Sequence, residues 1–116
     1  MNDNDKLITS VIDISKSILD ETFKHWYKAG TDDIELVKEI KRVIKGAQNY
    51  YQKHDDNEKE ITLISSVLRQ YAENKYLEYW EKDWEDDITN DNYEDIMEKG
   101  KTSFNYVFEN EEHPKI

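Results

Sequence analysis

The residues that could carry chemistry gather in one acidic stretch, positions 78–95, with the sequence EYWEKDWEDDITNDNYED. Nine carboxylates and a single cation, Lys82, give it a net charge of −8, out of −11 for the whole chain. Trp and Tyr are enriched at protein interfaces, and a purely solvated face has no need of them. The aromatic residues among these charges are Tyr79, Trp80, Trp84 and Tyr93. We therefore expect a protein-binding surface here, against the simpler alternatives of a solvated acidic face and of tryptophans buried in the core.

The expected binding residues combine charge with aromatic anchors. The charge footprint is Glu81, Glu85, Asp86 and Asp87, flanked by Glu78 and Asp83. These carboxylates crowd the C-terminal end of a predicted helix, where the helix dipole disfavours anions, so their placement indicates a purpose other than folding. The expected anchors follow one another at four-residue steps: Tyr76, Trp80 and Trp84.

Catalysis and metal binding are not expected. The chain has no cysteine and no glycine-rich phosphate loop, and its three histidines lack partners at metal-ligand spacing. Alternating acidic and hydroxyl residues from Asp83 to Glu94 match the ligand spacing of an EF-hand loop, but its sixth position, normally glycine, is Ile88. A β-branched residue strongly disfavours the positive φ required there. We predict a non-enzymatic protein with no cofactor and no dedicated metal site.

The charge of the chain restricts its partners. Nucleic acid and anionic membranes repel a chain of net charge −11, so neither is an expected partner, whereas a basic protein is. No apolar run approaches the ~18 residues of a membrane span, and the first residues do not form a secretory signal. These features predict a cytoplasmic location.

Positions 78–87 resemble a polyanion if they are helical. Six carboxylates and one lysine over ten helical residues, or ~15 Å, give about one net charge per 3 Å, close to the 3.4 Å spacing along one DNA strand. In size, acidity and helical content the chain resembles phage-encoded DNA-mimic inhibitors of restriction and anti-CRISPR proteins. The resemblance is one of composition and class without a shared motif, and it implies inhibition of a basic nucleic-acid-binding protein or nuclease.

Two other functions remain open. An immunity protein that neutralises a toxin nuclease would use a similar surface, with carboxylates for steering and a few aromatic anchors for affinity. Alternatively, homodimerisation through the stripe from Tyr76 to Trp84 would make the chain an assembly or regulatory module.

Apolar periodicity predicts the elements that position this stretch. Helices are expected over 5–28, 33–53, 58 to about 88, and 92–108, with N-caps at Asp32, Asn57 and Asp91 and a C-terminal glycine at Gly30. The predicted fold is all-α: a small antiparallel bundle of three to four helices. One domain would occupy 1–108, followed by a flexible acidic tail at 109–116.

The third helix carries two apolar stripes that do not align. Ile64 and Leu68 lie on one face, whereas Tyr76, Trp80 and Trp84 lie on a face rotated by about 120–150°. Three explanations are open: a break or kink near Asn74, a second half that faces something other than the core, or a following helix that bends around this end. Gly100 within the fourth helix predicts either close packing against a neighbour or a local break.

Overall fold

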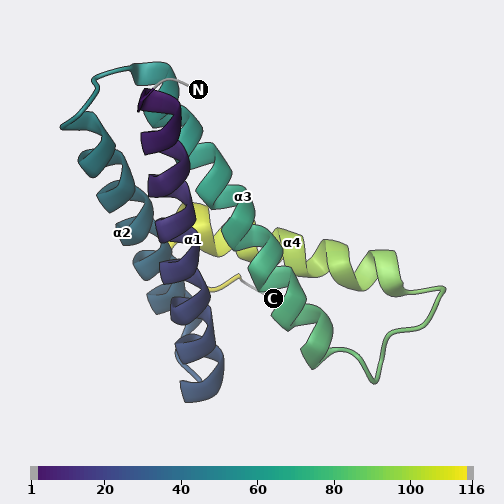
Figure 1. The fold of residues 1–116 in the computed structure, drawn as a ribbon. Coiled ribbons are helices and arrows are strands. Elements are labelled where there is room, and N and C mark those ends of the chain that lie inside the picture. Colours follow the sequence, from purple (N-terminus) through teal and green to yellow (C-terminus); the bar gives the residue numbers. More distant parts are fainter. Residues whose placement is uncertain (1–2, 115–116) are drawn as a thin grey trace.

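The chain folds into four helices joined by short loops in the computed structural model, which describes residues 3–114 (Figure 1). The helices are α1 (Asp3–Ala29), α2 (Asp33–Gln52), α3 (Glu58–Asp83) and α4 (Tyr93–Asn110). No strand occurs between residues 3 and 114. The predicted all-α bundle is confirmed, and the largest boundary error is at the end of α3, five residues earlier than predicted.

Local signals account for most helix ends. The Asp32 side chain caps α2 by accepting a hydrogen bond from the Ile34 amide (2.7 Å), and Asn57 caps α3 through the amides of Lys59 and Glu60. Gly30 follows α1 with φ of +66°, the left-handed conformation that a glycine adopts without a Cβ penalty. The predicted cap at Asp91 is wrong, because the N-cap residue of α4 is Asn92 and its side chain makes no capping hydrogen bond.

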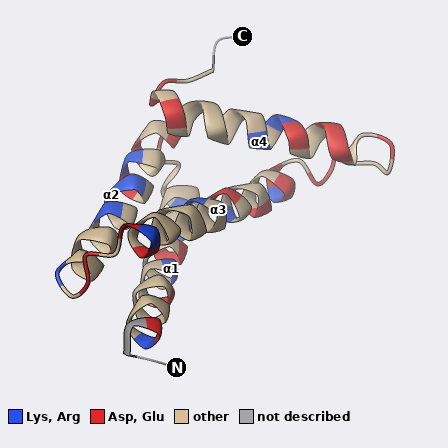
Figure 2. Ribbon diagram, turned by 90° about the horizontal axis from the view of Figure 1, so that it is seen from above, with Lys and Arg blue, Asp and Glu red and all other residues tan. Residues whose placement is uncertain are grey.

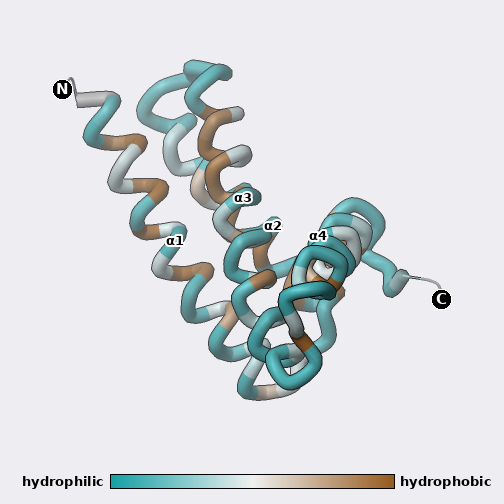
Figure 3. Tube along the Cα trace, turned by 90° about the vertical axis from the view of Figure 1, so that its right-hand side faces the viewer, coloured by the Kyte–Doolittle hydropathy of each residue, from teal (hydrophilic) through white to brown (hydrophobic). Residues whose placement is uncertain are grey.

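The core lies between α1, α2 and α3, and α4 closes it from one side. Completely buried residues come from every helix, among them Leu19, Phe23, Ile40, Tyr51, Ile64, Leu68, Phe104 and Val107. Apolar positions recur at helical spacing along α1 and α3 (Figure 3). Within the described residues, α4 contacts α2 and α3 but not α1. The helix α4 is therefore attached to the rest of the chain through α3 and through α2.

The second half of α3 leaves the three-helix body together with the first half of α4. Figure 2 shows these two segments extending away from α1 and α2 and joined at the far end by the loop between them. The helix α3 is continuous through Asn74, so no break occurs there. Trp80 of the rotated stripe instead packs against α4. The second half of α3 therefore meets a different neighbour from the first half, which was one of the three explanations that the sequence left open.

The C-terminal boundary also differs from the prediction. Residues 109 and 110 belong to α4, and Glu111 ends it with φ of +51°. Glu111 forms a salt bridge with Lys41 (3.0 Å), and His113 lies 2.7 Å from the Asp32 carboxylate. Positions 115 and 116 of the predicted tail lie outside the described residues, and the flexibility of the tail stays a prediction. None of the described helices has the length and apolar character that crossing a membrane would require.

Candidate functional site

The acidic residues project from the body on what we call the acidic arm, residues 78–95, which comprise the end of α3, the following loop and the start of α4. In Figure 2 the acidic positions recur around the far end of α3 and α4. Every one of the nine carboxylate residues on the arm is exposed. The arm therefore presents its charge to solvent rather than to the body of the protein.

The carboxylates of the arm are almost without counter-ions. Among the described residues, the one salt bridge that reaches the arm joins Lys75 to Glu78 (3.3 Å) at its base. The other salt bridges lie outside the arm, such as Lys41–Glu111 and Arg69–Glu109. The predicted footprint residues Glu81, Glu85, Asp86 and Asp87 form none. The negative electrostatic potential of these four carboxylates is consequently not neutralised by a salt bridge within the described chain.

The predicted row of charges is only partly helical. Since α3 ends at Asp83, the residues Glu85, Asp86 and Asp87 lie in the turn beyond it. The expectation of ten evenly spaced helical residues is therefore wrong. Carboxylates in the last turn of a helix repel one another and the negative end of the helix dipole. The helix therefore ends before the residues where carboxylates are most closely spaced.

Asp83 differs from its neighbours because it joins the arm to α1. Its carboxylate accepts a hydrogen bond from the Tyr27 hydroxyl (2.7 Å), and this bond raises the pKa of Tyr27. The Tyr27 ring also lies 4.7 Å from that of Tyr79 and beneath the Lys82 ammonium, 5.5 Å away. The base of the arm is thus held by specific contacts to the end of α1.

Tyr76 is a core residue and not a surface anchor. It is 5% exposed, and its hydroxyl donates to the Asp33 carboxylate (3.3 Å). Burial raises the pKa of Tyr76, and the neighbouring Asp33 charge adds to the effect. Asp33 accepts a second hydrogen bond from the Trp26 indole (3.1 Å), and burial raises the pKa of Asp33 although both hydrogen bonds oppose it. Tyr76 therefore ties α3 to α2.

Trp80 fastens α4 to α3. It is half-buried, and its indole nitrogen donates to the Ile96 carbonyl (2.9 Å). The indole also lies against the backbone of Gly100, where an added Cβ would be 2.7 Å from its Cδ1 atom. Close packing of Gly100 against a neighbour, one of the two alternatives predicted for this glycine, is confirmed. Within this conformation, Trp80 serves an interface between helices of one chain rather than an interface with a partner.

Two aromatic residues of the arm do face solvent. Trp84 is 41% exposed at the end of α3, and Tyr93 is 40% exposed as the first residue of α4. Trp84 was among the predicted anchors, whereas Tyr93 was not. The missed signal is its position: a residue opening a helix beyond a polar loop has few neighbours to cover it. The arm therefore keeps two exposed aromatics, on the two sides of its loop.

The loop between these aromatics is held by its own hydrogen bonds. The Asn92 side chain donates to the Asp87 carbonyl (2.8 Å) and accepts from the Thr89 amide (2.6 Å). The Asn92 amide donates back to the Thr89 hydroxyl (3.3 Å). Across residues 3–114, no group of three or more His, Cys, Asp or Glu side chains is arranged to hold a metal ion. The hydrogen bonds of Asn92 thus fix the backbone conformation of the loop.

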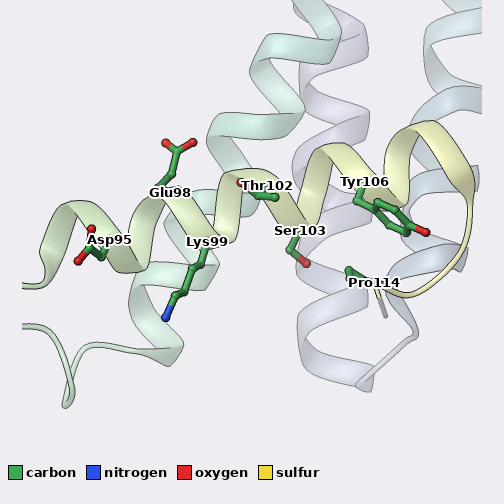
Figure 4. A pocket seen from close by; sticks show the side chains of 7 residues that line it. All are labelled: Asp95, Glu98, Lys99, Thr102, Ser103, Tyr106 and Pro114. Carbon is green, nitrogen blue, oxygen red and sulfur yellow. The ribbon is translucent and has the colours of Figure 1, made fainter. Parts of the chain in front are cut away.

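A hollow of about 1000 Å³ adjoins the arm along α4. Figure 4 shows its side chains following α4 from Asp95 at the arm to Tyr106, with Pro114 of the C-terminal segment beneath. The complete lining is Asp95, Glu98, Lys99, Thr102, Ser103, Tyr106 and Pro114. Sequence reasoning missed it, since Pro114 lies in a segment without periodicity, whose position beside α4 no local pattern predicts. The hollow extends the acidic surface into a concave site with hydroxyls and one aromatic ring.

Comparison with family models, curated proteins and solved structures gave no match for this chain.

Proposed function

We propose that the chain is a non-enzymatic binding protein whose acidic arm inhibits a basic, nucleic-acid-handling protein by occupying its nucleic-acid site. The observation that carries the proposal is the electrostatic isolation of the arm. Apart from Glu78 at its base, the carboxylates of the arm form no salt bridge, whereas elsewhere in the described chain some carboxylates on α1, on α2 and at the end of α4 do. A concentrated, unneutralised charge steers an oppositely charged partner and accelerates association.

The exposed aromatics support the same function. Trp84 and Tyr93 flank the loop, and each presents a large ring among carboxylates. Charge alone supplies steering and salt-dependent attraction, whereas buried aromatic anchors supply most of the affinity at protein interfaces. The hollow along α4 gives a partner side chain a place to enter beside Asp95. The arm therefore combines an electrostatic footprint with points of anchorage.

The proposal takes the form of a polyanion mimic, in which the turn carboxylates substitute for phosphates without helical regularity. A basic cleft recognises charge density over several ångströms, so an irregular array serves if it is dense. Such a mimic tolerates the loss of any single carboxylate, and its binding weakens steeply with salt.

The decisive experiment compares two sets of four neutral substitutions. The test variant carries Glu81→Gln, Glu85→Gln, Asp86→Asn and Asp87→Asn on the arm. The control carries Asp13→Asn, Glu35→Gln, Asp56→Asn and Glu112→Gln, all exposed and outside the arm. Both sets change the net charge from −11 to −7. Tagged proteins are used to capture partners from a host lysate at low and high salt, with identification by mass spectrometry.

We expect the wild type and the control variant to retain a basic partner at low salt and the arm variant to lose it. Equal retention by both variants, or the absence of any basic partner of the wild type, would refute the proposal. Trp84→Ala gives a second readout, because this exposed ring contributes to binding but little to the core. An immunity protein, favoured by the two exposed aromatics, is distinguished by the collapse of binding on the loss of a single carboxylate of the arm, which a polyanion mimic tolerates.

A further inference from the structure

The segment that follows α4 turns back and is held on α2 at two points. We call residues 111–114 the C-terminal strap. Glu111 forms a salt bridge with Lys41 in the middle of α2 (3.0 Å). The ring nitrogen Nε2 of His113 lies 2.7 Å from the carboxylate of Asp32, the residue that caps the start of α2. The strap therefore joins the end of α4 to a helix that α4 itself contacts much less than it contacts α3.

The backbone at the start of the strap is unfavourable by itself. Glu111 has a φ of +51°, and its amide donates to the Val107 carbonyl (2.7 Å). A left-handed conformation at the end of a helix is usual for glycine and is disfavoured for a residue that carries a Cβ. The local sequence thus does not favour this turn, and the position of the strap depends on its contacts with α2.

The contact between His113 and Asp32 depends on the charge of the histidine. The two oxygens of Asp32 have different partners, since Oδ1 accepts the Ile34 amide (2.7 Å) and Oδ2 faces His113. The Ile34 hydrogen bond, together with His113, holds the pKa of Asp32 below its usual value, so this carboxylate is ionised at neutral pH. A protonated ring donates to it as a partner of opposite charge, whereas a neutral ring offers a hydrogen bond without that charge.

The groups of the helical body around this contact are acidic or uncharged. The charge of His113 also acts on Asp33, whose pKa is raised by burial. Asp33 is held by the Trp26 indole of α1 and by the Tyr76 hydroxyl of α3. Trp26 does not titrate, and burial raises the pKa of Tyr76, so its hydroxyl stays neutral up to pH 8.

The strap and α4 contribute the remaining groups. Glu112 precedes His113 and is exposed, and Glu111 is already paired with α2. On α4, Lys99 and Tyr106 line the hollow beside the strap, and the acidic residues of the hollow lie toward the arm (Figure 4). Carboxylates, lysine and tyrosine ordinarily keep their charge between pH 5 and pH 8, whereas histidine does not. His113 is therefore the group on which the pH dependence of the strap should depend.

Pro114 connects this contact to the hollow along α4. It directly follows His113 and lines the hollow together with Ser103 and Tyr106 (Figure 4). We propose that His113 and Asp32 form a pH-dependent latch, in which the protonated ring holds the strap on α2 and closes one side of the hollow. The latch is closed while both groups are charged. As pH rises and the ring loses its proton, the strap shifts towards an open position and the hollow becomes accessible from that side.

The latch lies at the end of the hollow that is remote from the acidic arm. None of its groups belongs to residues 78–95, and its closure requires no partner. The inference therefore does not depend on the function proposed for the arm.

Paramagnetic relaxation in solution NMR measures the position of the strap. A nitroxide on Glu112→Cys labels one site only, because the chain has no cysteine, and Glu112 is exposed. With the strap closed, the label broadens the amide signal of Leu36, which is protected by its hydrogen bond to the Asp32 carbonyl. Since exposed ion pairs are weak, the ratio of closed to open strap should fall by up to about fivefold between pH 5.5 and pH 8.0. The broadening of the Leu36 signal should fall with it.

Three substitutions in the labelled chain identify the groups responsible. His113→Gln keeps a polar side chain that cannot be protonated in this range. Asp32→Asn removes the charge and keeps the helix cap, since asparagine caps helices as well as aspartate does. Both should abolish the pH dependence. His54→Gln is the matched control, because His54 is an exposed histidine just beyond the opposite end of α2, and it should leave the pH dependence unchanged.

The midpoint of the change should coincide with the midpoint of the His113 ring signals in the same sample. Equal broadening at both pH values in the labelled chain without further substitution would overturn the inference. So would a pH dependence that persists in His113→Gln, as titration of Asp33 would produce, or in Asp32→Asn. Its loss in His54→Gln would do the same. Far-UV circular dichroism of each variant checks that the helices are retained.

Discussion

Replacing Gly100 with alanine probes the junction that positions the acidic arm. A Cβ at this position would lie 2.7 Å from Trp80 Cδ1 and 2.8 Å from both Cγ and Nε1. Non-bonded carbon atoms prefer separations of about 3.5–4.0 Å, so the indole or the helix has to shift. The indole cannot shift without cost, because its nitrogen donates to the Ile96 carbonyl and its ring lies between those of Tyr76 and Trp84.

Two opposing terms decide the size of the effect. Alanine is favoured over glycine in a helix interior by about 1 kcal/mol. Inserting a methyl group into a well-packed contact costs about 1–3 kcal/mol. The net loss of stability should therefore be up to about 2 kcal/mol, from the difference of these two terms. Gly46→Ala is the matched control, since its new methyl meets no atom of the same chain and should stabilise the monomer by about 1 kcal/mol.

Urea denaturation followed by circular dichroism measures both changes. A second background isolates the contact: in Trp80→Ala the clash is absent, and Gly100→Ala should then become stabilising. This reversal of sign is the signature of direct packing between Trp80 and Gly100.

The reasoning would be refuted if Gly100→Ala stabilised the otherwise unchanged chain as much as Gly46→Ala does. That result would mean that α4 does not pack on Trp80, and the direction of the acidic arm would have to be reconsidered. Retention of a destabilising effect in the Trp80→Ala background would have the same meaning.

Three further predictions concern buried polar groups and the arm. Burial raises the pKa of Asp33, so its ionisation lowers stability as pH rises from its unfolded pKa through its folded pKa; Asp33→Asn should gain stability relative to wild type between pH 3 and pH 7, measured by urea titrations at both values. Glu73 is 7% exposed and its Oε1 atom has no hydrogen-bond partner; Glu73→Leu should raise stability by about 1 kcal/mol, and a loss would show that this carboxylate is satisfied. Trp84→Ala should change stability by less than about 1 kcal/mol, as expected for an exposed side chain. A decrease in melting temperature larger in size than the increase caused by Gly46→Ala would place Trp84 in the core.

Much of the fold could be predicted from sequence because its signals are local. Asp32 and Asn57 cap helices through side chains within a few residues, and Gly30 ends α1 by its own backbone conformation. The apolar spacing of α2 and of the first half of α3 likewise predicts residues that the structure buries, among them Ile40, Ile44, Ile64 and Leu68. The acidic stretch was also evident from sequence, since its composition needs no knowledge of the fold.

The tertiary structure decided how the second half of α3 is used. Tyr76, Trp80 and Trp84 share one helical stripe, yet the first is buried, the second is half-buried and the third is exposed. The difference arises from α4, which packs on Trp80 through Gly100 and Ile96 and leaves Trp84 exposed. No local rule specifies where a separate helix crosses. The end of α3 is a similar case. The four-residue spacing of apolar residues continues beyond Asp83, but repulsion among the carboxylates there favours an earlier end of the helix.

The exposed apolar residues of α1 show the same division. Ile14 and Ile18 follow Val11 at helical spacing, a pattern that predicts a core face. Only the placement of α3 and α4 on the other side of α1 and α2 left them exposed beside Gly46. Sequence determines which faces of a helix are apolar, because hydrophobic spacing is a property of the helix itself. It does not determine which of those faces the chain can cover, because that depends on where the remaining helices pack.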